Sequence, residues 1–216
     1  MSMSHLSPSS TLLRGWRIIF AGAGIGLVLA LAVSFLQPLR YSSTVRLLLK
    51  QQDVGSVDAY TASRSVERLA ENLSTIVYTT SFFEQVLNSG FDIDKGIFPT
   101  QEYKRRRAWS KMISATVSRG SGLLTISVYH PDVAQAEQIV NAVAYVLTQQ
   151  ASSYLSGGKV EIQVVDKALN SRWPAKPNIP ANVFSGFVLG GLAGVAYLLI
   201  QAERIRRRHQ LIDEEF

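Results

Sequence analysis

The stretch RWPAKPNIPANVFSGFVLGGLAG, Arg172 to Gly194, joins a proline-rich segment to an apolar run that is rich in glycine. The apolar run continues without charge from Ala181 to Ile200, and a second uncharged run covers Ile18 to Leu36. A helix of about 20 apolar residues can cross a hydrocarbon core of roughly 30 Å. The sequence therefore predicts two transmembrane helices, at 18–36 and 179–202, one near each end of the chain.

The first apolar run has an alternative interpretation as a signal peptide. Arg14 and Arg17 would form its positive start, and Ala30 to Ala32 would hold the cleavage site. The run is longer than the usual signal core of about 7 to 15 residues, and this length favours a membrane span that is retained.

The charges that flank the second run predict the orientation. Arg204 and Arg206 to Arg208 directly follow it. Cytoplasmic flanks are enriched in Lys and Arg. We therefore expect 1–17 and 203–216 to be cytoplasmic, with 37–178 as an extracytoplasmic domain that ends in the proline-rich segment.

The enclosed region alternates between strand and helix patterns. Period-two alternation indicates strands, and apolar residues spaced by three and four indicate helices. A hairpin is expected where two alternating runs meet at RGSG, Arg119 to Gly122. The expected elements are a strand at 41–49, a helical stretch at 61–87, a loop at 88–99, a helix at 101–112, a hairpin over 113–130, a helix at 131–155 and a strand at 159–168.

This order predicts a small α+β domain close to the membrane, flanked by two transmembrane helices. The first and last strands each connect to a span. If these strands pair, they bring the two spans together at the membrane.

The sequence does not display catalytic chemistry. It has no cysteine, which excludes disulfides and thiolate sites, and its histidines are His5, His130 and His209. His5 and His209 fall on the predicted cytoplasmic side and His130 on the other. Motifs for zinc hydrolases, serine hydrolases and nucleotide binding are absent from the sequence. We expect a non-enzyme without a cofactor or metal, and the net charge of +6 does not lead us to expect a nucleic acid partner.

Two short motifs have competing interpretations. His130-Pro131-Asp132 is found in J-domain co-chaperones between two helices, but a strand precedes it here, which favours a helix start. Lys104, Arg105, Arg106 and Arg107 could bind phosphate or an acidic glycan. Consecutive positions point around most of a helix, so a solvated surface is the favoured interpretation.

The glycines of the apolar runs recur at spacings of four. Gly186, Gly190 and Gly194 follow this spacing in the second run, as do Gly22 and Gly26 in the first. Small residues on one face of a membrane helix let another helix approach closely. We expect these glycines to pack helices together, although glycine is also generally common in membrane helices.

The prolines recur every third residue, at Pro174, Pro177 and Pro180. This is the period of a polyproline II helix. Such a segment is stiff and would hold the domain at a fixed height above the bilayer. The alternative is that the prolines only end a strand and open a helix.

The proline motif followed by Gly186 resembles that of bacterial polysaccharide co-polymerases, also called chain-length-determinant proteins. The two-span layout is similar, as is GLLTISVYHPDVAQAEQIVNAVA, a strand, a Pro-Asp turn and a helix that carries Asn141. The resemblance implies a non-catalytic protein of the bacterial cytoplasmic membrane that forms homo-oligomeric rings. It further implies control of the length or amount of lipopolysaccharide O-antigen, capsule or exopolysaccharide, together with a polymerase or exporter.

The chain lacks the long helical insertions and the fused tyrosine kinase of larger family members. Its size resembles that of the short adaptor branch, whose cytoplasmic tail stimulates a separate bacterial tyrosine kinase. The resemblance then makes Leu211, Ile212 and Phe216 candidate contacts for such a kinase. A tail that merely ends in an aromatic residue is the alternative.

Two other classes remain open at this point. A two-span membrane sensor would bind a ligand with its outer domain and signal through its tail. A membrane enzyme would need clustered polar groups that the sequence does not display.

Overall fold

The computed structural model describes residues 15–51, 59–154 and 160–213. The chain divides into two compact units. The helical unit combines the two ends of the chain, Met1–Pro38 and Pro177–Phe216, and the α+β unit comprises Leu39–Lys176.

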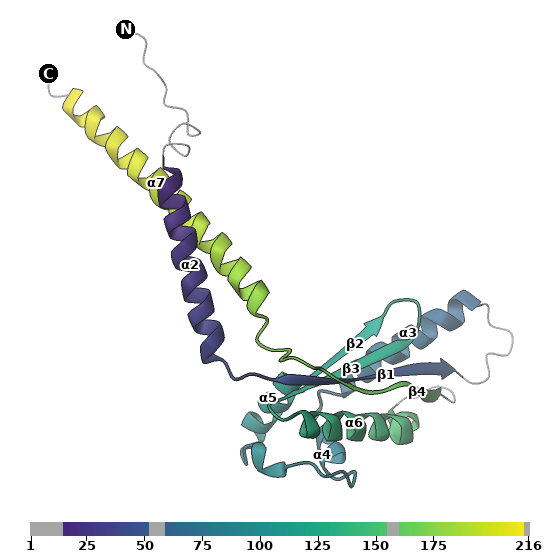
Figure 1. The fold of residues 1–216 in the computed structure, drawn as a ribbon. Helices are drawn as coiled ribbons and strands as arrows, with labels where there is room; N and C mark the ends of the chain where they lie inside the picture. The colour runs from purple at the N-terminus through teal and green to yellow at the C-terminus, as the bar shows by residue number, and fades with distance from the viewer. Residues whose placement is uncertain (1–14, 52–58, 155–159, 214–216) are drawn as a thin grey trace. The chain divides into compact units, whose positions relative to one another are not determined.

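A four-stranded antiparallel sheet forms the frame of the α+β unit (Figure 1). The strands are β1 (Tyr41–Gln51), β2 (Ile113–Ser118), β3 (Leu123–His130) and β4 (Val160–Asn170), in the order β2-β3-β1-β4. The register pairs β2 with β3 and β1 with β4. The predicted hairpin is confirmed, and the first and last strands, whose pairing the sequence left as a possibility, pair with each other.

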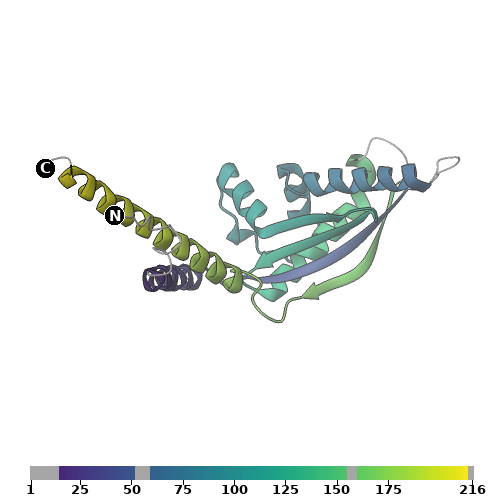
Figure 2. The ribbon, with the colours of Figure 1, turned by 90° about the horizontal axis from the view of Figure 1, so that it is seen from above.

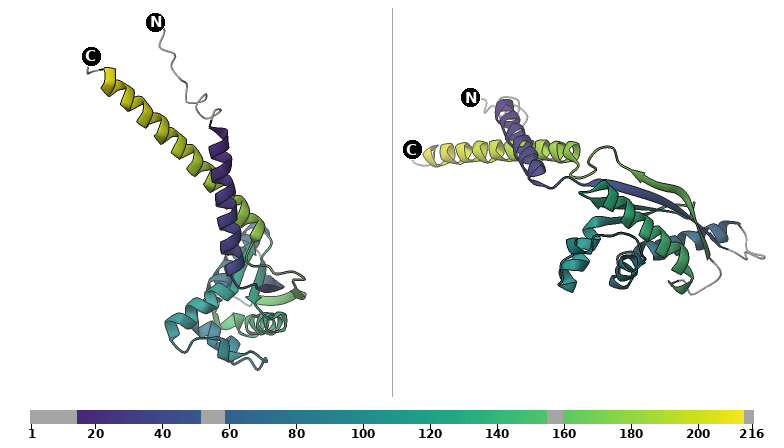
Figure 3. Two further views of the ribbon diagram at one scale, coloured as in Figure 1. Left: turned by 60° about the vertical axis from the view of Figure 1, so that its left-hand side comes forward. Right: turned by 60° about the horizontal axis from the view of Figure 1, so that its bottom comes forward.

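Helices pack against one face of this sheet. They are α3 (Ala59–Ile76), α4 (Thr80–Leu87), α5 (Glu102–Met112) and α6 (Val133–Tyr154). Figures 2 and 3 show α3, α4 and α6 on the same side of the strands. The fold class predicted from the sequence, α+β between two long apolar helices, is confirmed.

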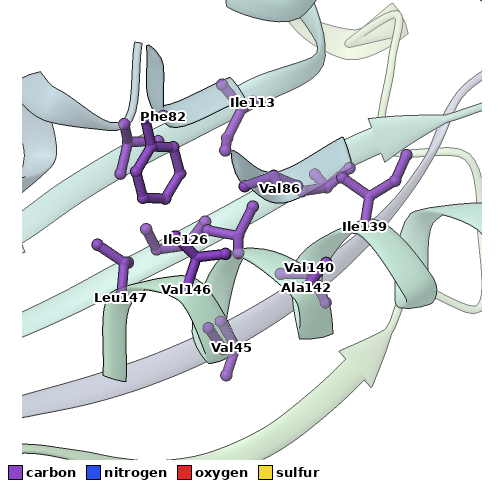
Figure 4. Packing of buried hydrophobic residues seen from close by; sticks show 14 of the residues in the cluster. Val45, Phe82, Val86, Ile113, Ile126, Ile139, Val140, Ala142, Val146 and Leu147 are labelled. Carbon is purple, nitrogen blue, oxygen red and sulfur yellow. The ribbon is translucent and has the colours of Figure 1, made fainter. Parts of the chain in front are cut away.

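The hydrophobic core lies between the sheet and these helices. Along β1, Val45, Leu47 and Leu49 are at most 2% exposed, whereas Arg46 and Lys50 are exposed. Figure 4 shows how α4 and α6 contribute their apolar side chains to the same cluster as the strands. The alternation in the sequence therefore matches a sheet that is buried on one face.

The stretch predicted to be helical at 61–87 consists of two helices, α3 and α4. The backbone of Thr79 is extended, and its hydroxyl accepts the N–H of Phe82 at 3.3 Å, which caps α4. Just before it, the Val77 carbonyl accepts the indole N–H of Trp109 at 2.8 Å instead of continuing a helix. The predicted loop at 88–99 contains a single 3₁₀ turn, η1 (Lys95–Ile97).

The helical unit consists of α2 (Trp16–Leu36) and α7 (Ile179–Asp213). The whole of α2 and the Ile179–Arg204 part of α7 are long and apolar enough to cross a membrane. These ranges agree with the predicted spans. The helix continues past the predicted end of the second span, through residue 213.

Candidate functional site

The most extensive contact of the helical unit is the interface between α2 and α7, which cross in Figures 1 and 3. The helices are antiparallel. Gly22 of α2 lies against Gly190 and Gly194 of α7, and Gly26 lies against Gly186 and Gly190. All five glycines predicted to pack helices meet in this one interface, within a single chain.

The two backbones are too close at these positions to admit a side chain. A Cβ atom added to Gly22 would lie 2.7 Å from the carbonyl oxygen of Gly190. A Cβ atom added to Gly26 would overlap the carbonyl oxygen of Gly186, and one added to Gly190 would overlap that of Gly22. Glycine is therefore required here by close helix approach.

A polar pair closes the interface at one end. Ser34 of α2 is 1% exposed, and its hydroxyl accepts the side-chain N–H of Asn182 of α7 at 3.0 Å. The same hydroxyl donates to the carbonyl of Ala30 at 2.8 Å. Sequence reasoning missed this pair. Extending the four-residue spacing would have found it, since Ser34 is two steps beyond Gly26 and Asn182 one step before Gly186.

The glycine faces of both helices are thus occupied by each other. The remaining surface is apolar and exposed, for example at Phe20, Val28, Leu189 and Leu192. Such a surface suits lipid contact. Packing against another copy, which the sequence also predicts, would have to use this surface and stays a prediction.

The predicted polyproline II helix through Pro174, Pro177 and Pro180 is wrong. The backbone bends at Trp173 and again at Pro177, and Pro180 is the second residue of α7. The residues between the prolines pair with the chain before β1. The N–H of Ala175 donates to the carbonyl of Arg40 at 2.7 Å. Proline suits the first helical turn because it lacks an N–H that the turn would leave unpaired.

Lys176 lies at the end of this segment. The N–H of Arg40 donates to its carbonyl at 2.9 Å, and its ammonium nitrogen stands 3.7 Å from the ring centroid of Tyr129. Burial, and to a lesser degree the charge of Arg40, lower the pKa of Lys176.

His130 and Asp132 act at a helix start, as the favoured interpretation predicts. The Asp132 carboxylate accepts the N–H of Ala134 at 2.8 Å, and its carbonyl accepts that of Ala136 at 3.0 Å. The Nδ1 atom of His130 lies 2.9 Å from the Asp132 amide nitrogen. Because a backbone N–H can only donate, we assign Nδ1 as the acceptor of this amide, which places the ring proton on Nε2, a buried atom without a hydrogen-bond partner among the described residues.

The basic cluster of α5 is mostly solvated. Lys104, Arg106 and Arg107 are exposed, while Arg105 is partly buried. Arg105 pairs with Glu84 at 3.0 Å and lies over the ring of Phe83 at 5.6 Å. The four cations therefore do not converge on one point, and the predicted solvated helix surface agrees with this arrangement.

Of the candidate kinase contacts, Leu211 and Ile212 lie within α7, and Phe216 lies outside the described residues. Within the described ranges, no cluster of three or more His, Cys, Asp or Glu side chains could hold a metal ion. Comparisons with protein-family models and with curated proteins give no match. The co-polymerase resemblance therefore rests on the residues quoted for it.

Proposed function

We propose that the protein regulates the polymerisation or export of a bacterial surface polysaccharide without catalysing either step. It would act as an oligomer in the cytoplasmic membrane, with both termini in the cytoplasm. Its partners would be the polysaccharide polymerase or exporter and, through its C-terminal tail, a separate tyrosine kinase. In this proposal the polymer length or amount depends on how many subunits gather around the export machinery.

The single observation that carries the proposal is the layout of the chain. An α+β unit lies between two apolar helices, and its first and last strands, which connect to those helices, pair with each other over most of their length. The same layout, together with the proline motif before Gly186, carries the resemblance to polysaccharide co-polymerases. A unit whose ends are joined in this way is suited to act as one rigid block beside neighbouring copies.

The continuation of α7 supports a role for the tail. Ile179–Arg204 suffices to span a bilayer, and the helix runs on to Asp213. A helical extension of this kind would present its side chains to a cytoplasmic partner at the fixed spacing of a helix.

A deletion strain tests the proposal through the size and amount of its surface polysaccharide. The strain is complemented with the full chain or with a form that ends at Arg208. An altered profile that only the full chain restores supports action through the tail, and equal rescue by both forms supports action through the membrane and outer parts. An unchanged profile after deletion contradicts the proposal.

A two-span sensor is the second candidate, because the α+β unit has an open polar hollow between α4 and α6. Glu84, Gln85 and Asn88 line it together with the exposed ring of Tyr145. Polar groups beside an aromatic face could bind a small polar ligand. A purified protein that stays monomeric in detergent and binds such a ligand would favour this candidate over the first.

A further inference from the structure

Trp173 is an exposed aromatic residue of the α+β unit, at 75%. Leu39, at 52%, is an exposed apolar residue at the start of the same unit. Indole rings combine a large apolar surface with one N–H donor, and they are enriched where water meets a membrane.

Hydrogen bonds on both sides of Trp173 fix the backbone of this segment. On one side, the N–H of Ser171 donates to the carbonyl of Ser42 at 2.7 Å. The N–H of Ser42 in turn donates to the hydroxyl of Ser171 at 2.8 Å. On the other side, the N–H groups of Ala175 and Lys176 both donate to the carbonyl of Arg40, at 2.7 and 3.1 Å. Residues 172–174 are therefore a short bulge, here called the Trp173 bulge, tied to β1 and its N-terminal extension at both ends.

The bulge lies close in sequence to both predicted spans. Trp173 comes six residues before α7 begins at Ile179, and Leu39 comes three residues after α2 ends at Leu36. An extended chain covers at most about 3.3–3.6 Å per residue, so both side chains stay within roughly 20 Å of a span end.

Two cationic residues adjoin the bulge. Arg40 and Lys176 are joined by their backbones, and neither takes part in the ion pairs of the described ranges, Arg46–Asp166 and Arg105–Glu84. Partial burial, and to a lesser degree repulsion by the charge of Arg40, lower the pKa of Lys176. A nearby anion would relieve this repulsion.

We propose that the Trp173 bulge is a membrane-surface anchor, in which Trp173 and Leu39 insert among lipid headgroups while Arg40 and Lys176 bind lipid phosphates. The inference rests on the proposed two-span topology. It adds a contact between the α+β unit and the bilayer that the spans alone do not require. A surface of apolar and cationic groups matches the interface of an anionic membrane.

Tryptophan fluorescence of the full chain in lipid nanodiscs tests this anchor. The variant Trp16→Phe leaves Trp173 and Trp109, and Trp109 is 1% exposed in the core. Lipids brominated near the headgroup should quench Trp173 more strongly than lipids brominated near the chain ends, and aqueous iodide should quench it weakly.

A reporter at the far end of the sheet is the matched control. Tyr60 is 70% exposed and lies in the first turn of α3, where the Ser63 hydroxyl donates to the Gly120 carbonyl of the β2–β3 hairpin, at the opposite end of the sheet from the Tyr41–His130 pair. In Trp16→Phe/Trp173→Phe/Tyr60→Trp, iodide should quench the new reporter and brominated lipid should not. If Trp173 behaves like this reporter, or is shielded from both quenchers, the anchor is refuted; the second result would indicate protein contact instead.

Lipid charge tests the two cations. Replacing zwitterionic by anionic lipid should increase the quenching of Trp173 by headgroup-brominated lipid. Arg40→Gln or Lys176→Gln should each lower the ratio of docked to undocked protein by about fivefold. No dependence on lipid charge would overturn the phosphate assignment. In Trp173→Phe, quenching of Trp16 by brominated lipid reports whether α2 lies in the bilayer. A failure of the two-span topology is thereby distinguished from a failure of the anchor. The polysaccharide profile tests the proposed function independently of both.

Discussion

Substituting one glycine of the α2–α7 interface by alanine should separate the two helices, while the same change at the next residue should not. A Cβ atom on Gly190 would overlap the carbonyl oxygen of Gly22 and lie 3.0 Å from the Cα of Gly26. A Cβ atom on Gly191 would meet only the Cβ of Ala23, at an ordinary 3.8 Å. The atoms near Gly190 are backbone atoms of another helix, so they cannot rotate away.

The expected cost for Gly190→Ala is that of inserting a methyl group into a filled interface, about 1–3 kcal/mol. This corresponds to a factor of roughly 5 to 150 in the pairing equilibrium, since about 1.4 kcal/mol is tenfold. Gly191→Ala should be neutral or slightly favourable, because alanine gains up to about 1 kcal/mol over glycine within a helix.

Cross-linking measures the pairing directly, since the chain has no cysteine of its own. Ser34→Cys and Asn182→Cys place two thiols where the side chains are in contact in the folded protein. A short bis-maleimide should join them rapidly within one chain, more slowly with Gly190→Ala, and at the original rate with Gly191→Ala. Equal rates for the two alanine variants would refute the close-approach argument.

Three further predictions concern the α+β unit, each measured by unfolding of the full chain in detergent. His130→Ala removes a buried imidazole and with it the acceptor of the Asp132 amide, so it should lower stability by about 1–3 kcal/mol, whereas His130→Asn, whose carbonyl can replace Nδ1, should lose clearly less; equal losses would contradict the assigned tautomer. Trp109→Phe keeps one aromatic ring but leaves a cavity in the core and the Val77 carbonyl without its N–H donor, so it should cost at least about 1–3 kcal/mol, and a neutral result would contradict that bond. The lowered pKa of Lys176 means that the unfolded chain binds more protons between the folded and unfolded pKa values, so its contribution to stability should rise as pH increases through that window. Lys176→Gln should remove this rise, and an unchanged slope would exclude Lys176 as its source.

The strands were predictable because their signals are local. Alternating apolar residues mark each strand, and RGSG marks the hairpin turn. Gly120 and Gly122 adopt φ values of +72° and +61° there, which glycine reaches without the Cβ clash of other residues. Pairing of β1 with β4 was only a possibility at that point, raised because both strands connect to the apolar helices.

Other features depend on contacts that a local pattern does not contain. The break between α3 and α4 is fixed where Trp109, far along the chain, takes the Val77 carbonyl. Val164 pairs with the buried Leu47, yet it is itself 42% exposed because β4 is an edge strand of the sheet. The proline period was misleading for the same reason, since Arg40 supplies the hydrogen bonds that bend the segment.

The sequence pattern also did not identify which helix packs against the glycine faces, and the connectivity of the chain explains why it is a helix of the same chain. A four-residue glycine spacing predicts close packing but does not say whether the other helix belongs to the same chain. In the α+β unit, Arg40 and Lys176 are held together by backbone hydrogen bonds of 2.9 and 3.1 Å, close to where the two helices attach. This closure holds α2 and α7 at a high effective concentration, so their association loses little further entropy. A helix from another copy must lose its translational freedom to reach the same face. The glycine faces are therefore filled from within the chain, and any ring of subunits must form through the surfaces that remain.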